Sequence, residues 1–386
     1  MEKLTPEEIK RYSRHLTLRE IGLEKQLKLK RASVLIVGAG GLGVPALQYL
    51  TAAGVGTLGI ADHDQVDLSN LQRQVLYTVD DIGKPKAETA AARLKKLNPN
   101  VNLVVHPDRI EARNAMAILE KYDIILDGTD NFATRYLLND ACILLDKPLV
   151  HGSILKFEGQ LSVFNYKRPE GTFTANYRDL FPTPPDADSV PNCEEAGVLG
   201  VLPGIIGTMQ ANEALKIILG YGTPLAGILL LFDAATMQQT LIKIPDRQTR
   251  RTITTLIDYD EFCGKSQEKS KSLEPDFNPT RMKEITVQEL KELQESGADF
   301  QLIDVREPHE YDICNLDGEL IPMSEVPGNV DKIDKNKKVV VHCRSGKRSG
   351  DAILWLERNH QFNNLYNLKG GILAWAKEID PEMPTY

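Results

Sequence analysis

The residue best suited to chemistry is Cys343, which follows an apolar run at 339–342 and precedes a helical pattern from about Ser349. A strand, a glycine-containing loop and a helix start surround one point with backbone N–H groups and give it positive potential. We therefore expect Cys343 to be a thiolate, and hence a nucleophile, rather than an inert buried thiol. The residues expected to form the loop around it, three of them cations, are Arg344, Ser345, Gly346, Lys347 and Arg348.

Two kinds of cysteine enzyme use such a loop. Enzymes that handle phosphate need room for a tetrahedral group and place five residues between cysteine and arginine, whereas here Arg348 follows after four. The shorter loop favours a single extra sulfur atom, a persulfide. The segment resembles the active-site loop of rhodanese-type sulfurtransferases, and residues 301–311 and 370–375 are similar to the conserved strand and closing helix of that family. The resemblance implies a small rhodanese-like α/β domain over residues 280–386.

A second chemical pattern is the glycine turn at 38–43, which joins an apolar run to a helical pattern. Its glycines permit a tight turn and let a phosphate approach the helix N-terminus. Asp62 ends the next apolar run, where a ribose hydroxyl would be bound. Taken alone, this pattern fits a nicotinamide dinucleotide as well as ATP. The glycines concerned are Gly38, Gly40, Gly41 and Gly43.

The charged residues that follow the turn favour a nucleoside triphosphate. Arg73 and Lys86 could neutralise phosphates, and Asp130 follows an apolar run at the sheet edge where ligands bind. A carboxylate there is suited to hold Mg²⁺ against phosphates. Hydride transfer needs neither the carboxylate nor the cations, so an NAD-dependent oxidoreductase with a sulfur-transfer domain is the less favoured alternative. A carrier-binding scaffold without catalysis is a third.

Residues 1–263 resemble the adenylating enzymes that activate ubiquitin-like sulfur carriers, relatives of the molybdopterin-synthase and thiazole-pathway adenylyltransferases. The similarity rests on residues 11–15, 37–43, 62–74, 83–86, 127–131 and 193–198. It implies a Rossmann-like adenylating domain in which Asp62 binds the ribose and Asp130 coordinates Mg²⁺. The other positions that the resemblance assigns to nucleotide binding are Asp64, Asn70, Arg73, Lys86 and Asn131.

Two further roles are implied by this resemblance alone. Arg14 would reach the ATP of a second subunit, which implies a homodimer. Cys193 follows a proline-rich segment at 180–193 and would take part in the acyl or sulfur-transfer step, the alternative being a structural loop cysteine.

The chain departs from the family pattern at one place. Many relatives carry two CxxC pairs that bind a structural zinc, but Asn176 and Asp179 replace the first pair, and Asp260 stands in the second with Cys263. A tetrahedral zinc site needs four soft or imidazole ligands. We therefore expect no zinc.

The length of 386 residues suggests two or three domains, and the polar, lysine- and serine-rich segment 264–279 is interpreted as a linker. A net charge of −8 does not favour nucleic-acid binding, and no apolar run is long enough for a membrane span. The charged N-terminus is not a secretory signal. Five widely spaced cysteines indicate a reducing cytoplasm rather than a disulfide framework.

Apolar runs alternating with helical patterns predict a mostly parallel α/β sheet before the linker and a second α/β domain after it. Together the two halves predict one pathway. ATP adenylates the C-terminal Gly-Gly of a ubiquitin-like carrier, and a persulfide on Cys343, filled by a donor such as a cysteine desulfurase, converts the carrier to a thiocarboxylate. Molybdopterin biosynthesis is the favoured pathway; thiamine thiazole synthesis and tRNA thiolation stay open.

Overall fold

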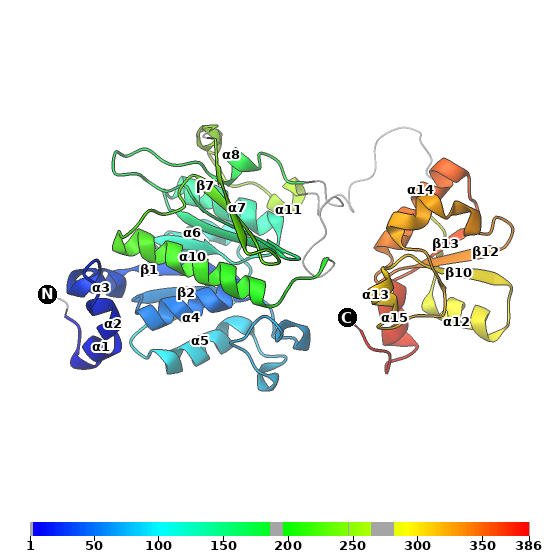
Figure 1. Ribbon diagram of the computed structural model, residues 1–386, viewed down its shortest axis with the longest axis horizontal. Helices are drawn as coiled ribbons and strands as arrows, with labels where there is room; N and C mark the ends of the chain where they lie inside the picture. The colour runs from blue at the N-terminus through cyan, green and yellow to red at the C-terminus, as the bar shows by residue number, and fades with distance from the viewer. Residues whose placement is uncertain (1–2, 186–195, 246, 264–281, 386) are drawn as a thin grey trace. The chain divides into compact units, whose positions relative to one another are not determined.

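The computed structural model describes residues 3–185, 196–245, 247–263 and 282–385 (Figure 1). Its chain divides into two compact units, Met1–Ser272 and Leu273–Tyr386. The predicted linker at 264–279 lies outside the described residues.

The first unit is built on an eight-stranded sheet with the order β3-β2-β1-β4-β5-β6-β7-β8. The first five strands in this order are parallel and the last three run antiparallel to their neighbours. This confirms the predicted Rossmann-like sheet. The strands are β1 (Ser33–Val37), β2 (Thr57–Ala61), β3 (Asn102–His106), β4 (Ile124–Asp127), β5 (Leu149–Leu155), β6 (Glu158–Phe164), β7 (Ile228–Asp233) and β8 (Gln238–Lys243).

Both faces of this sheet are covered by helices. Val34 and Ile36 of β1 belong to one core, whereas Leu35 and Val37 belong to the core on the other face. A continuous apolar run is what a strand buried on both faces requires. The first core is closed by α3 (Gly22–Arg31), α4 (Gly43–Ala53), α5 (Lys86–Leu97) and α10 (Val201–Leu219), and the second by α6 (Ala112–Leu119), α7 (Phe132–Leu144), α8 (Tyr177–Leu180) and α11 (Tyr259–Phe262). Two short helices, α1 (Pro6–Arg11) and α2 (Ser13–Leu16), come first in the chain.

Local signals set most of the element bounds. The predicted helix at 86–97 is α5, and the capping box at Thr5 begins α1 with Pro6 in its first turn. Helix α10 is longer than the predicted 208–219, because its first turns are apolar on all sides and give no amphipathic period.

The second unit contains a five-stranded parallel sheet with the order β11-β10-β12-β13-β9. Alternate residues of β12 point into two cores, Val339 and Val341 into one and Val340 into the other. Helix α14 contributes to the first core, and α12 and α15 to the second. The main elements are β9 (Glu284–Ile285), α12 (Val287–Glu295), β10 (Phe300–Asp304), α13 (Pro308–Tyr311), β11 (Glu319–Leu320), β12 (Lys338–His342), α14 (Lys347–His360), β13 (Leu365–Leu368) and α15 (Gly371–Glu378).

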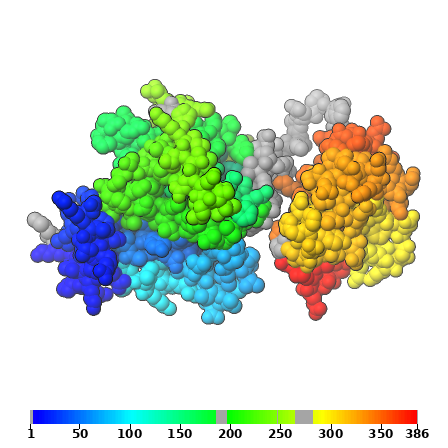
Figure 2. Space-filling view, viewed as in Figure 1, coloured from blue at the N-terminus to red at the C-terminus, as the bar shows by residue number. Residues whose placement is uncertain are grey.

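The space-filling view shows the outer surface of each unit from the same side (Figure 2), and buried apolar side chains form the cores inside. None of the helices described in either unit has the length and apolar character that a membrane crossing needs.

Candidate functional site

The parallel strands of the first unit bring three loops to one edge of the sheet. Val37 at the end of β1 pairs with Ala61 of β2 on one side and Asp127 of β4 on the other. The N–H of Gly38 donates to the carbonyl oxygen of Ala61 at 2.8 Å, and the N–H of Gly128 donates to that of Val37 at 2.8 Å. The glycine turn is therefore held between the loops that carry Asp62 and Asp130.

The glycines of the turn serve different purposes. Gly38 has φ +92°, and a Cβ there would lie 2.6 Å from the Gly128 oxygen; a Cβ on Gly43 would lie 1.8 Å from the Gly38 oxygen. These two glycines are required by the packing of backbone on backbone. A Cβ on Gly40 would meet only Gln74 Nε2, at an ordinary 3.5 Å. Since no side chain caps the start of α4, the open side of the turn can receive a phosphate.

Asp62 is fixed to the turn by its carboxylate, which accepts hydrogen bonds from the N–H groups of Ala39 at 2.7 Å and Asp64 at 2.8 Å. Burial raises the pKa of Asp62, and the charge of Lys86 only partly opposes this rise. Lys86 itself is buried, with its Nζ 3.1 Å from Asp64 Oδ2. The structure thus brings Asp62, Asp64 and Lys86 together.

Arg73 lies against the glycine turn, because its Cγ is 3.6 Å from the position of a Cβ on Gly41. Its Nη1 donates to the Ser69 carbonyl oxygen at 2.9 Å. Asn70 Oδ1 accepts from the Asp67 N–H at 3.2 Å, which shapes the short 3₁₀ turn η1 (Leu68–Asn70). Arg73 therefore lies where a phosphate bound to the glycine turn could contact it. Asn70 shapes the 3₁₀ turn that precedes Arg73.

In the loop after β4, Asn131 has a structural role, whereas the side chain of Asp130 faces solvent. Asn131 Oδ1 caps α7 by accepting from the Thr134 N–H at 2.9 Å, so this oxygen is already used. Asp130 is exposed at the edge. Among the described residues the one cluster of three close metal-ligand atoms is Asp62, His63 and Asp64, and Asp130 is not part of it. A lone exposed carboxylate fits Mg²⁺, which typically takes one or two carboxylates and completes its shell with phosphates and water.

A buried polar network behind this loop was not found from the sequence. Asp127 accepts from His151 Nδ1 at 3.0 Å, and Arg135 Nε lies 3.5 Å away. Burial alone would raise the pKa of Asp127, but the hydrogen bond from His151 and the charge of Arg135 outweigh it, so the pKa is lowered. Gln210 of α10 donates to the Asp127 carbonyl oxygen at 2.7 Å. Polar residues inside the apolar runs of β5 and α10 were the only signal.

Two predicted residues remain. Arg14 is exposed on α2. Cys193 lies outside the described residues.

In the second unit, Cys343 follows β12 and is only 1% exposed. Its Sγ lies 3.2 Å from the N–H of Gly346 and 3.4 Å from the hydroxyl of Ser349, which itself donates to Asn367 at 2.7 Å. Gly346 adopts φ +93°, and a Cβ there would lie 3.2 Å from the Leu368 oxygen. One backbone N–H, that of Gly346, is thus directed at the sulfur, while the Ser349 hydroxyl gives its proton to Asn367 and packs beside the sulfur.

The positively charged residues near Cys343 are arranged differently from what the sequence predicted. Helix α14 begins at Lys347 rather than near Ser349, so Lys347 and Arg348 belong to its first turn. Arg348 makes two hydrogen bonds to Glu310, at 2.6 and 2.7 Å, and these offset its charge. The carbonyl oxygens of Cys343 and Arg344 accept from the start of α15, at 2.9 and 3.1 Å, which fixes the loop.

Comparison with known proteins identifies both units. Residues 12–253 match the model of the ThiF family, and residues 286–378 match that of the rhodanese-like domain. The chain belongs to the ThiF family.

Full-length relatives combine the same two domains in one chain. The probable adenylyltransferase/sulfurtransferase MoeZ of Mycobacterium tuberculosis is 44% identical over 386 residues, which cover 99% of this chain and 96% of the relative. The adenylyltransferase and sulfurtransferase MOCS3 of Aedes aegypti is 43% identical over 408 residues, covering 100% of this chain and 90% of the relative. This protein is therefore an adenylyltransferase and a sulfurtransferase.

Solved structures agree on the fold of the ThiF domain. E. coli MccB, crystallised with MccA-N7isoASN, superposes with a TM-score of 0.54 at 22% identity, covering 61% of this chain and 72% of that one. PaaA gives a TM-score of 0.52 at 23% identity, covering 63% and 76%. At such identities the likeness concerns the fold alone.

The positions compared above with zinc-binding cysteine pairs hold a hydrogen-bonded cluster. Asn176 Nδ2 donates to Asp179 at 2.8 Å and to the Thr249 hydroxyl at 2.9 Å, and that hydroxyl donates to Asp179 at 2.8 Å. Asp260 pairs with Arg109 at 3.0 Å. These side chains are occupied with one another and supply one sulfur, so the donor set does not fit zinc.

Behind this cluster a buried ion pair joins α7 to α8. Arg178 donates twice to Asp140, at 2.8 and 2.7 Å, and the hydroxyl of Tyr259 donates to the same carboxylate at 2.7 Å. The α8–α11 region is thus held by charge and hydrogen bonds.

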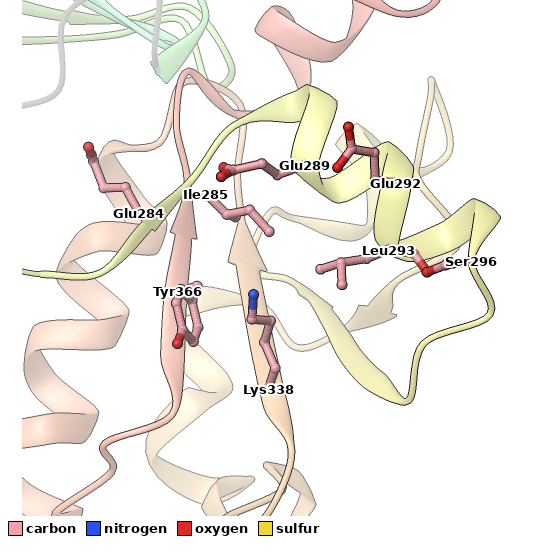
Figure 3. Close-up of a pocket in the computed structure, with 8 residues that line it drawn as sticks. All are labelled: Glu284, Ile285, Glu289, Glu292, Leu293, Ser296, Lys338 and Tyr366. Atoms are coloured by element: carbon pink, nitrogen blue, oxygen red, sulfur yellow. The ribbon is translucent and has the colours of Figure 1, made fainter.

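A hollow of about 470 Å³ in the rhodanese-like domain lies away from Cys343 (Figure 3). Lys338, whose Nζ is 4.4 Å from the centre of the Tyr366 ring, begins β12, whereas Cys343 follows the end of that strand. We assign this hollow no part in sulfur transfer. Its lining residues are Glu284, Ile285, Glu289, Glu292, Leu293, Ser296, Lys338 and Tyr366.

The two kinds of glycine in the turn can be tested with matched variants. Gly43→Ala should lower the free energy of unfolding of the ThiF domain by about 3 kcal/mol, because its methyl group would collide with the Gly38 oxygen. Gly40→Ala should fold with a stability within about 1 kcal/mol of wild type but bind ATP more weakly. Thermal unfolding and equilibrium ATP binding would measure both. Equal stability of the two variants would contradict this account.

His342 gives the rhodanese-like domain a pH-dependent stability. It is fully buried, its Nε2 is 3.6 Å from Asp304 Oδ2, and neither ring nitrogen has a hydrogen-bond partner in the described structure. Burial lowers the pKa of His342 to about 4, although Asp304 opposes the shift and Arg306 adds to it. In the unfolded chain the imidazole takes up a proton near pH 6.5, whereas in the folded domain it does so only near pH 4. The free energy of unfolding therefore keeps its full value above pH 6.5 and falls by up to ~3 kcal/mol as the pH drops to 4.

Tryptophan fluorescence can follow this loss, because both tryptophans of the chain, Trp355 and Trp375, lie in the rhodanese-like domain. In His342→Gln the part of the pH dependence that comes from the imidazole should vanish. The same fall in unfolding free energy between pH 6.5 and 4 in both proteins would show that His342 does not carry it.

Removing the buried ion pair should destabilise the ThiF domain, whereas a chelator should not. Arg178→Ala leaves the Asp140 carboxylate buried without its cation, at a cost of about 3 kcal/mol. Arg168→Ala, which breaks an exposed contact of 4.0 Å with Glu170, should cost under about 0.5 kcal/mol. Thermal unfolding with and without a zinc chelator, together with elemental analysis, would test this. One bound zinc per chain, or a melting temperature lowered by the chelator, would disprove the prediction.

Proposed function

We propose that this enzyme adenylates the C-terminal Gly-Gly of a small ubiquitin-like sulfur carrier and then replaces AMP with sulfur to give a thiocarboxylate. The observation that carries the proposal is the presence, in one chain, of a phosphate-accessible glycine turn with Asp130 at its edge and of a cysteine held by backbone donors. The first suits nucleotide activation, the second persulfide transfer.

In the first step a carrier carboxylate oxygen attacks the α-phosphorus of ATP, and the bond to pyrophosphate breaks. The turn at Gly38–Gly43 receives the phosphates at the start of α4. Asp62, held by Ala39 and Asp64, binds the ribose. Arg73 and Lys86 offset the negative charge that develops on the phosphates, and Asn70 and Asn131 order the loops that contact them.

Asp130 would hold Mg²⁺ against the phosphates, and the ion, when bound, neutralises part of their charge. Asp127, locked by His151 and Arg135, fixes the loop on which Asp130 is carried.

In the second step the terminal sulfur of a Cys343 persulfide attacks the acyl carbon and AMP leaves, giving an acyl disulfide. The thiol of Cys193 would then attack the Cys343 sulfur and release the thiocarboxylate, leaving a disulfide for an external thiol to reduce. The N–H of Gly346 would stabilise the sulfur anion. Arg344, Ser345 and Lys347 belong to the same loop and helix start.

We further propose a homodimer in which Arg14 reaches the ATP of the second subunit. The sulfur donor would be a protein such as a cysteine desulfurase, and the domains would be 1–263 and 280–386 with the linker between them. The favoured pathway is molybdopterin biosynthesis, which agrees with the relationship to MOCS3. We also propose a cytoplasmic location, because a reducing compartment keeps the Cys343 thiol free to carry sulfur.

The two sites should fail independently. Asp130→Asn should reduce carrier- and Mg²⁺-dependent ATP–pyrophosphate exchange at least about 100-fold and leave thiosulfate sulfurtransferase activity unchanged. Cys343→Ala should abolish sulfurtransferase activity and leave the exchange unchanged. Mass spectrometry of the carrier after reaction with ATP and a sulfur donor should show one oxygen replaced by one sulfur. The proposal fails if the wild-type enzyme shows no exchange with any carrier ending in Gly-Gly.

A further inference from the structure

One segment of the ThiF domain, residues 70–77, runs along the glycine turn and contacts it at successive positions. The hydroxyl of Tyr77 donates to the Ala39 carbonyl oxygen at 2.8 Å. The side-chain amide nitrogen of Gln74, Nε2, lies 3.5 Å from the position of a Cβ on Gly40. The amide of Gln74 therefore lies beside the side of the turn that is open to a phosphate.

The backbone fixes Gln74 in this place. Its N–H donates to the Asn70 carbonyl oxygen at 2.9 Å, and its own carbonyl oxygen accepts from the Tyr77 N–H at 3.1 Å. Because Tyr77 is itself bonded to the turn, the backbone at Gln74 cannot leave the turn without breaking these hydrogen bonds. The side chain is thus presented to the turn by a fixed piece of chain.

The amide of Gln74 is buried at an energetic cost. The residue is 4% exposed, and its Oε1 has no hydrogen-bond partner among the described residues. A buried amide oxygen without a partner destabilises the folded state, whereas methionine would fill a similar space without that loss. A residue that only filled space here would be better apolar.

Gln210 shows what a structural amide looks like in the same domain. Its Oε1 also lacks a partner in the described structure, but its Nε2 donates to the carbonyl oxygens of Asp127 and Val150, at 2.7 and 3.3 Å. Those two hydrogen bonds link α10 to the ends of β4 and β5. Among the described residues the amide of Gln74 makes no such link, so its polar group points to a ligand.

The position of Gln74 along the turn selects the α-phosphate of the nucleotide. Asp62, to which the proposed function assigns the ribose, accepts from the Ala39 N–H at 2.7 Å, so the ribose lies near Ala39. Gly40 is the next residue, and the α-phosphate is the phosphate joined directly to the ribose. Arg73 contacts the turn one residue further on, on the side of the remaining phosphates.

We propose that Gln74 is a further catalytic residue of adenylation, whose Nε2 donates a hydrogen bond to an oxygen of the α-phosphate. This inference rests on the proposed function, because it takes the ribose to be bound at Asp62. Negative charge develops on the α-phosphate oxygens while the carrier carboxylate attacks the phosphorus and the bond to pyrophosphate breaks. A donor that is already fixed beside those oxygens stabilises this charge, and Gln74 neither loses a proton nor forms a covalent bond.

The test uses the full-length enzyme and compares AMP, which carries only the α-phosphate, with adenosine, which carries none. In Gln74→Met the affinity for AMP should fall at least about fivefold, whereas the affinity for adenosine, measured by competition with ATP, should stay at the wild-type value. With a purified ubiquitin-like sulfur carrier ending in Gly-Gly, kcat of ATP–pyrophosphate exchange should fall at least about tenfold and the KM for the carrier should not change. Gln72→Met makes the same chemical change at an exposed residue two positions away and should leave all these values unchanged.

Two further variants separate this role from a structural one. Gln74→Met should melt at or above the wild-type temperature, because it removes a buried amide oxygen that has no partner, whereas Gln210→Met breaks two buried hydrogen bonds and should melt at a lower temperature. Gln74→Glu keeps the shape of the side chain but places an acceptor against the phosphate, and should weaken AMP binding at least about tenfold while adenosine still binds.

Equal losses of affinity for AMP and adenosine, together with a lower melting temperature of Gln74→Met, would make Gln74 a structural residue and overturn the proposal. Unchanged affinity for AMP in Gln74→Met would overturn it as well, while the proposed function would stand. If the wild-type enzyme showed no exchange with any carrier but the variants lost affinity for AMP alone, Gln74 would stand as a ligand of the α-phosphate and the proposed chemistry would fall.

Discussion

The close approach of Gly43 to Gly38 is the contact on which the adenylation site depends. With 1.8 Å between the Gly38 oxygen and the place of a Cβ at Gly43, only a bare backbone lets α4 begin so soon after β1. That abrupt start leaves the first N–H groups of α4 facing the edge of the sheet, where Asp62 and Asp130 also end up. The parallel pairing of β1, β2 and β4 brings their carboxyl ends to the same edge of the sheet, so the loops that follow them lie side by side.

The rhodanese-like domain has the same local arrangement of a buried strand, a glycine turn and a helix start. A buried strand ends at Cys343, a glycine with positive φ turns the chain, and a helix begins at Lys347. In the ThiF domain the open donors suit phosphates, whereas here a donor is turned onto a single sulfur atom. The pairing of Arg348 with Glu310 shows that a cation near an active site can serve mainly to fix the loop.

The region around α8 is held together by hydrogen bonds and charge. Asn176, Asp179 and Thr249 join two segments by hydrogen bonds, and the ion pair of Arg178 and Asp140 supports them. Such a network depends on every donor meeting an acceptor in a dry place. The sequence pattern singled out Asn176 and Asp179 but not Thr249 or Asp140, because those two residues lie far from them along the chain.

The sequence by itself indicated the two α/β domains and the glycine turn, and it singled out Asp62, Lys86, Asp130 and Cys343 as candidate site residues, because apolar periodicity and short motifs are local properties of the chain. Only the tertiary structure decided that Asn131 caps a helix, that Arg348 belongs to Glu310 and that Asp127 is locked by His151 and Gln210. Those facts arise from contacts between distant parts of the chain, and the spacing of residues carries no record of which partner a polar side chain finally meets.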